Sequence, residues 1–327
     1  MIVLDTWQAN MGQRPSTQRH RSLSCHCVGI EEEQALREDL IDKVIAKANE
    51  GDGMLSRIEL GSFEYAGQRI RVIDIQGGIW NPGASWPLGD QLRATLSINT
   101  TTSGKYADQE VSGGLWRYDY QAGGTAGKNT KMRKAMELQL PLIWFRQQDS
   151  GRYVPYKVFI INDFPGEGYC FIAPDLSLAT AARSESLIER RYAERIMKQR
   201  LHQPAFRAQV ISAYETKCAI CRLGHGRLLD AAHITPDNDE TSSTSVTNGL
   251  SLCKIHHTAY DINIVGIDAN YTVHIRADIL AEKDGPMLQH GIKEMDNSTL
   301  WIPPARSARP DPERLDARFR EFASQGV

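Results

Sequence analysis

One short stretch, from Cys218 to Asp261, constrains this chain more than any other part of its sequence. It contains two pairs of metal-binding residue types, Cys218-Ala-Ile-Cys221 and Cys253-Lys-Ile-His256. Such turns present thiolates and an imidazole from tight knuckles, which is how proteins hold a tetrahedral zinc ion. Only 31 residues separate the two pairs, so one zinc ion bound by all four side chains would close a single small motif. The alternative is that these cysteines are ordinary buried apolar residues.

The residues between and after the two pairs predict a β-hairpin followed by a helix. We expect a strand over 228–234, a polar loop over 235–247, a second strand over 250–252 and a helix from 255 to 260. His233 and His257 would then face each other across this ββα unit. One histidine can take a proton from water, while a second histidine and a carboxylate can hold a divalent cation that stabilises a departing oxyanion. A lone His233 would ordinarily be a core histidine, but its pairing with Asn248, His257 and the cysteine pairs favours the catalytic interpretation.

Composition and charge set the broad class of the protein. The chain has 327 residues, 41% of them hydrophobic and 24% charged, which is enough for two domains with their own cores. It has no apolar run that could span a bilayer, and Met1 to Asn10 has no secretory pattern, so we expect a cytoplasmic protein without membrane contact. Six cysteines are too few for a disulfide scaffold. Cys25 and Cys27 form a C-x-C without a second ligand pair, so we expect incidental thiols there.

The N-terminal half predicts a strand-rich domain with a leading helix. Residues 1–30 show no periodicity and are expected to be disordered or weakly ordered. A helix is expected over Glu31–Ala48, and a second over Asn129–Leu138, inserted among the strands. Short runs rich in β-branched and aromatic residues predict the strands, at 69–75, 92–98, 115–120, 142–145, 156–161 and 168–172.

A basic helical segment follows the strand-rich region. Seven Lys or Arg and three Glu lie between Ala181 and Val210, which could place this segment along phosphates or could simply be a solvated helix face. We expect Pro204 to divide the helical pattern of 187–214 into a linker helix and a second helix. Beyond Asp261 the sequence predicts a strand over 271–275 and a helix over 312–322.

His233, Asn248 and His257 occur in this order between and directly after the two metal-binding pairs, and this pattern resembles an HNH (ββα-metal) nuclease domain. The resemblance implies that His233 is the general base, that Asn248 positions the loop and the base, and that His257 ligates a catalytic Mg²⁺ or Mn²⁺ ion. It also implies that Asp261 supports the histidines and that Cys218, Cys221, Cys253 and His256 hold a structural Zn²⁺. Many family members place an Asp or His ligand directly before the base, where this chain has Ala232. Asp230, two residues earlier on the same strand face, is the carboxylate that we expect to replace it.

The strand-rich region resembles the SET-and-RING-associated (SRA, or YDG) reader of modified bases. The resemblance rests on Ser103-Gly104-Lys105-Tyr106-Ala107-Asp108, the Tyr118 strand, the Gly123-Gly124 pair and the helix over 129–138. It implies a domain that flips a modified cytosine, stacks it on Tyr106 and Tyr118, and hydrogen-bonds its edge through Asp108. In the family the acid can lie one residue further on, where this chain has Gln109. The alternative is that these aromatic residues belong to the core.

Together these features predict an α+β chain with four parts. They are a weakly ordered segment (1–30), an SRA-like, PUA-like barrel with its leading helix (31–180), a basic helical linker (181–210) and a zinc-stapled ββα-metal HNH domain (211–327). The leading hypothesis is a modification-dependent restriction endonuclease that cuts foreign double-stranded DNA, such as phage DNA, carrying 5-methyl- or 5-hydroxymethylcytosine. Two cutting sites are needed for a double-strand break, which favours a homodimer. The alternatives are an HNH DNase with a sensor for another signal, and a non-catalytic zinc protein that binds DNA.

Overall fold

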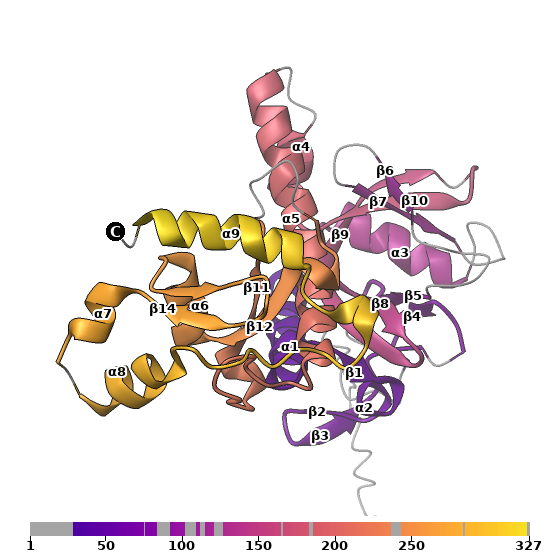
Figure 1. The fold of residues 1–327 in the computed structure, drawn as a ribbon. Helices are drawn as coiled ribbons and strands as arrows, with labels where there is room; N and C mark the ends of the chain where they lie inside the picture. The colour runs from indigo at the N-terminus through magenta and orange to yellow at the C-terminus, as the bar shows by residue number, and fades with distance from the viewer. Residues whose placement is uncertain are drawn as a thin grey trace, which may run out of the picture.

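The structure is a computed structural model, and it describes residues 29–74, 76–83, 92–101, 109–111, 115–120, 127–164, 166–182, 186–236, 243–283 and 285–325. It has the mixed α+β architecture predicted from the sequence, with a strand-rich region before a smaller C-terminal part (Figure 1). Residues 1–28, with Cys25 and Cys27, lie outside the described residues. So do Tyr106, Asp108 and the Gly123-Gly124 pair.

The strand-rich region is built on one eight-stranded sheet. The strands follow the order β4-β5-β8-β9-β10-β7-β6, and β1 pairs with β9. Only β5 and β8 run parallel; the other pairs are antiparallel. Among the described residues no pairing joins β6 back to β4, so closure into a barrel stays a prediction. The bounds are β1 (Leu55–Ser56), β4 (Ile79–Trp80), β5 (Ser97–Thr100), β6 (Gln109–Val111), β7 (Leu115–Asp119), β8 (Leu142–Asp149), β9 (Arg152–Phe164) and β10 (Tyr169–Ala173).

Strand β8 shows why this sheet needs helices on both faces. Its first four residues are all buried: Leu142 and Trp144 point into one core, and Ile143 and Phe145 point into the other. A strand with two buried faces has a continuous apolar run in place of alternation. Helix α1 (Ile30–Glu50) covers one face and α3 (Lys128–Glu137) packs on the other, so both helices predicted for this region are confirmed. The short helix α2 (Arg57–Gly61) and the hairpin of β2 (Phe63–Tyr65) and β3 (Gln68–Ile70) complete the region.

Helix α1 is held to the strand-rich region by a fully buried ion pair. The guanidinium of Arg37 donates to the Glu33 carboxylate at 2.9 and 3.0 Å. It also donates to three carbonyls, those of Ala94 and Thr95 at 2.7 Å and that of Pro141 at 3.0 Å. Both side chains of the pair are 0% exposed. All five guanidinium N–H groups therefore have acceptors, which is the condition under which a buried charge is tolerated.

Two expected strands are shorter than predicted, because the residues left out of them make hydrogen bonds or core contacts of another kind. The prediction of a strand over 92–98 is wrong in its first half, since β5 begins only at Ser97. The carbonyls of Ala94 and Thr95 accept from Arg37, and Leu92 and Leu96 are buried against α1. Likewise β3 ends at Ile70, although Val72 and Ile73 are fully buried in the same core.

Helix α5 (Leu187–Ala213) corrects the prediction that Pro204 breaks the chain into two helices. The structure has one continuous helix of 27 residues with Pro204 inside it. A proline in a helix costs roughly 3 kcal/mol. The buried residues on either side of it outweigh that cost: Leu201 and Ala208 lie in the core of the strand-rich region, while Phe206, Val210 and Ile211 lie in the C-terminal core. Helix α4 (Leu176–Ala181) packs against the first half of α5.

The C-terminal part follows α5 and has its own core. Strand β11 (Leu229–His233) pairs with β12 (Gly249–Cys253), α6 (Lys254–Asp261) follows at once, and β13 (Val265–Ile267) pairs with β14 (Val273–Ile275). Helix α9 (Pro312–Gln325) lies against β13, where Phe322 covers Gly266. The remaining elements are the short helices α7 (Ala277–Ala281) and α8 (Pro286–Gly291), and the 3-10 turns η2 (Gly226–Leu228), η3 (Val246–Asn248), η4 (Lys293–Met295) and η5 (Arg306–Ala308).

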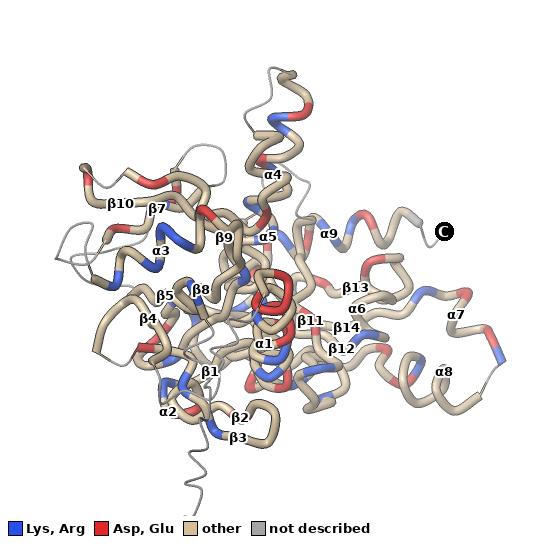
Figure 2. Tube along the Cα trace, turned by 180° about the vertical axis from the view of Figure 1, so that it is seen from behind, with Lys and Arg blue, Asp and Glu red and all other residues tan. Residues whose placement is uncertain are grey.

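Charged residues of both signs are interspersed along the described part of the chain (Figure 2), and the net charge of the full sequence is −2. Any attraction for a polyanion must therefore come from a local group of basic side chains. Over the described ranges, no helix is both long and apolar enough to cross a membrane.

Candidate metal centres and active-site cleft

The predicted ββα unit is present, and its register brings the two strands of the hairpin together as expected. Asp230 lies opposite Leu252, and His233 lies opposite Gly249. Helix α6 begins directly after Cys253 and carries His257 one turn from its start. One strand and one helix therefore supply the two histidines and the carboxylate that the sequence predicted for the open site.

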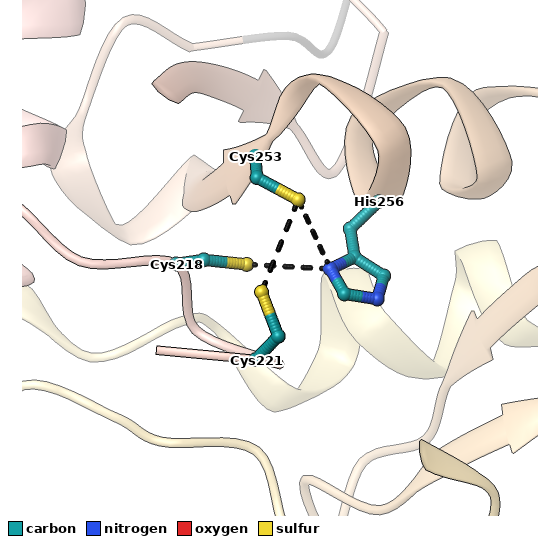
Figure 3. A group of neighbouring side chains, drawn as sticks. All are labelled: Cys218, Cys221, Cys253 and His256. Atoms are coloured by element: carbon teal, nitrogen blue, oxygen red, sulfur yellow. Dashed lines mark hydrogen bonds between the residues drawn. The ribbon is translucent and has the colours of Figure 1, made fainter. Parts of the chain in front are cut away.

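Four side chains of this unit form a closed cluster with the geometry of a zinc site (Figure 3). The ligand atoms of Cys218, Cys221, Cys253 and His256 all lie within 4.8 Å of one another. The Cys221 and Cys253 sulfurs are 3.9 Å apart, and His256 Nδ1 lies 3.5 Å from Cys218 Sγ and 3.2 Å from Cys253 Sγ. Tetrahedral zinc, with bonds of about 2.3 Å to sulfur and about 2.0 Å to nitrogen, requires sulfur–sulfur separations of about 3.8 Å and sulfur–nitrogen separations of about 3.5 Å. The residues present therefore fit a zinc ion.

Neighbouring groups set the protonation and position of the ligand residues in this cluster. His256 Nε2 lies 2.8 Å from the Gly291 carbonyl, so it carries the ring proton and leaves Nδ1 facing the sulfurs. Hydrogen bonds from Cys221 and Cys253 hold the pKa of the Cys218 thiol well below its usual range, and the thiolate is the form that binds metal. The backbone N–H of Ala219 donates to the Ser251 carbonyl at 2.7 Å, which ties the first knuckle to β12.

A second, open group of side chains lies on the same unit. Asp230 Oδ2 is 3.3 Å from His257 Nδ1, and Asp261 Oδ2 is 3.4 Å from His257 Nε2. Lys254 Nζ lies 2.5 Å from Asp230 Oδ1. The hydrogen bond from His257, together with Lys254, lowers the pKa of Asp230 to about 2, and the Asp230 hydrogen bond raises the pKa of His257. A carboxylate and an imidazole that meet at a solvent-accessible position can hold a hard divalent cation.

His233 lies on the wall of a cavity of about 580 Å³ that is also lined by Asp230 and His257. Its ring stacks on Phe206 of α5, with centroids 4.1 Å apart and planes 13° apart. Phe206 is 2% exposed, so the imidazole has a rigid apolar support on one face. The cavity thus brings together the histidine predicted as a base and the two residues predicted to hold the catalytic ion.

Asn248 lies beneath this site rather than in it. It is fully buried; its Oδ1 accepts from Thr235 N at 2.8 Å, and its Nδ2 donates to the carbonyls of Thr235 at 3.2 Å and Ser243 at 2.9 Å. These bonds close the loop that leaves β11 two residues after His233. The loop-positioning role that the sequence resemblance implies for Asn248 stays a prediction.

Of the three residues predicted to read a base, only Tyr118 lies within the described part of the chain. It is 4% exposed, and its hydroxyl donates to the Gly78 carbonyl at 3.0 Å. Its neighbours in the core include Trp116 and Trp144. This burial favours the alternative that Tyr118 is a core aromatic residue, and Tyr106 and Asp108 lie outside the described residues.

Two residues of α5 support the site in ways that the sequence did not predict, although Arg207 was counted in the basic segment between Ala181 and Val210. Phe206 supports His233, as described above. Arg207 Nη2 donates to the carbonyls of Gly226 at 2.8 Å and Leu229 at 3.2 Å, which holds the start of β11 against α5. Neither position belongs to a recognisable motif, and only the course of the continuous helix past β11 reveals them.

A family comparison agrees with the site geometry. A family model described as HNH endonuclease matches residues 218–268, and no curated protein matches the chain. Among solved structures, a modification-dependent TagI restriction endonuclease aligns over 84% of this chain and 92% of its own, with 17% identity and a TM-score of 0.29. An SRA domain of SUVH5 in complex with hemimethylated CG DNA aligns over 37% of this chain and 82% of its own, with 16% identity and a TM-score of 0.26. The Type IV phosphorothioation-dependent restriction endonuclease ScoMcrA aligns over 77% and 52%, with 11% identity and a TM-score of 0.23.

The family match covers the closed cluster, both strands of the hairpin, and helix α6 with His257. Residues 218–268 are therefore an HNH endonuclease segment, and this chain is a metal-dependent DNA nuclease.

Proposed function

We propose that this protein is a modification-dependent restriction endonuclease in which the strand-rich region recognises modified cytosine and the ββα unit cuts the DNA. The observation that carries the nuclease half is the closed cysteine and histidine cluster beside the open group of Asp230, His233 and His257, on one unit. A purely structural zinc motif needs no such open group. The reader half rests on the resemblance to SRA modules, with 5-methyl- or 5-hydroxymethylcytosine as its target.

Each residue of the site has a proposed part in hydrolysis. His233, supported by Phe206, takes a proton from the water that attacks phosphorus, while the bond to the leaving oxygen breaks. Asp230 and His257 hold the divalent cation, Mg²⁺ or Mn²⁺, which supplies charge stabilisation at the leaving oxygen when bound. Asp261 orients His257 through its second ring nitrogen. The closed cluster holds a structural Zn²⁺ that fixes the knuckles and the start of α6.

The reader half follows from the sequence resemblance and assigns recognition of the base to the strand-rich region. Tyr106 and Asp108 are proposed to contact a flipped base, which would be paired and stacked again after release. Because Tyr118 is buried, its proposed role is structural: its hydroxyl holds the Gly78 carbonyl in place. The DNA partner is double-stranded, and a cut in both strands calls for two active sites, as a homodimer would provide.

One experiment tests the whole proposal. Purified protein with Mg²⁺ is incubated with matched plasmids that carry cytosine, 5-methylcytosine or 5-hydroxymethylcytosine, and His233→Ala serves as the inactive control. Cleavage of modified plasmids alone supports the proposal. Equal cleavage of all three would show a nuclease with a different sensor, and binding without cleavage would show a non-catalytic zinc protein. Full activity of His233→Ala would refute the assignment of the base.

A further inference from the structure

The cavity in front of the catalytic histidines is built by both parts of the chain. One wall carries Asp230, His233 and His257 of the ββα unit. Ala48 and Asn49 in the last turn of α1 and residues 154–157 of β9 also line the cavity. Residues of helix α5, which connects the two parts, complete the lining. The site where the DNA strand is cut is therefore bounded by the strand-rich region as well as by the nuclease segment.

Basic side chains outnumber acidic ones along this cavity. Among the described residues, its lining includes Lys157 of β9, Arg200 and Arg207 of α5, and one carboxylate, that of Asp230. Arg207 already donates hydrogen bonds to the Gly226 and Leu229 carbonyls. Lys157 and Arg200 line the cavity and have side chains that are 33% and 51% exposed, so solvent reaches both.

The present partners of Lys157 and Arg200 do not prevent a second contact. Lys157 pairs with Glu38, and Arg200 Nη1 lies 2.7 Å from Asp175 Oδ2. Exposed ion pairs of this kind contribute only about 0–1 kcal/mol. A phosphate group, with its full negative charge, can replace or share such a partner at little cost.

We propose that Lys157 and Arg200 bind backbone phosphates of the DNA strand next to the scissile bond, an inference that rests on the proposed nuclease function. A strand whose scissile phosphate lies at Asp230 and His257 must carry its neighbouring phosphates through the same cavity. Lys157 belongs to the strand-rich region and Arg200 to the connecting helix. The cutting site is therefore composite, and the strand-rich region holds the substrate at the site of cleavage in addition to recognising a base.

Salt dependence of binding measures such contacts directly. Each phosphate contact adds about 0.9 to the slope of log affinity against log salt, which corresponds to roughly 3.5-fold in affinity over a fourfold rise in salt. We would introduce Lys157→Gln and Arg200→Gln, singly and together, into a His233→Ala parent. Binding of a fluorescent duplex with one 5-methylcytosine site is then measured by anisotropy from 50 to 200 mM salt, without added Mg²⁺.

The expected result is a slope that is smaller by about 1 for each single variant and about 2 for the double variant. The parent should then lose roughly tenfold more affinity than the double variant over this salt range. Arg320→Gln is the matched control, because Arg320 forms an exposed ion pair with Asp316 on α9 and does not line the cavity. The preference for modified over unmodified DNA should stay the same, since phosphate contacts carry no sequence information.

Three outcomes would overturn the inference. A slope equal to that of the parent would show that neither side chain contacts phosphate. Loss of the preference for modified DNA in the double variant would show that these residues serve recognition instead. A parent that binds no DNA would refute both this inference and the proposed function, whereas a wild type that binds DNA with the expected slopes but cuts none would refute the proposed function alone.

Discussion

Replacing Arg37 by methionine should destabilise the protein more than any surface change, because it leaves a charge buried without its partner. Arg37 and Glu33 are both 0% exposed. Removing one member of a buried pair typically costs about 3–5 kcal/mol. The carbonyls of Ala94, Thr95 and Pro141 lose their donor as well, at about 1–3 kcal/mol for each one that water cannot reach.

We therefore expect Arg37→Met to lower the free energy of unfolding by at least about 3 kcal/mol, out of a total of about 5–15 kcal/mol for a typical domain. The double variant Glu33→Leu, Arg37→Met also removes the Glu33 carboxylate, which the single variant leaves buried without its ion-pair partner. It still leaves the three carbonyls without the Arg37 donor. It should recover part of the loss, so the coupling energy of the double-mutant cycle should exceed about 1 kcal/mol.

Urea unfolding followed by tryptophan fluorescence is the assay, because Trp116 and Trp144 lie in the core of the strand-rich region. Arg320→Met is the control, since its exposed pair with Asp316 should change stability by less than about 0.5 kcal/mol. If Arg37→Met costs no more than this control, the buried pair does not anchor α1. The strand-rich region would then not depend on this pair to hold the cavity wall that α1 provides.

Three further predictions concern the nuclease segment. Removal of zinc with a strong chelator should release one ion per chain and unfold the C-terminal part, while the sheet of the strand-rich region persists. Metal analysis measures the released ion, and circular dichroism follows the unfolding. An unchanged melting profile would count against a structural ion. Gly249→Ala would place a Cβ 2.3 Å from Val210 Cγ2 and 2.9 Å from Phe206 Cζ. It should lower the free energy of unfolding by about 1–3 kcal/mol and slow cleavage, because the ring that supports His233 must move. Thermal melting measures the first effect and single-turnover rates measure the second. Phe206→Leu keeps an apolar side chain but removes the stacked ring, so it should reduce kcat with less than about 1.5 kcal/mol lost in stability; a kcat equal to wild type would rule out the supporting role.

The nuclease segment was largely predictable because its information is local. Ligand spacing in Cys218-x-x-Cys221 and Cys253-x-x-His256 specifies two knuckles whatever surrounds them, and the structure gathers all four side chains. The strand and helix that carry His233 and His257 were also predicted from short-range pattern. Helix α1 follows from apolar periodicity in the same way.

The sequence by itself thus determined the fold class, the metal-binding chemistry and the order of elements around it. Only the tertiary structure decided that α5 runs unbroken through Pro204, because burial in two separate cores outweighs the local cost of a proline. It alone brought Phe206, Arg207 and Lys157 to the cavity, and it buried Tyr118. The physical reason is that these positions depend on contacts between residues far apart in the chain, and such contacts leave no periodic pattern or spacing in the sequence.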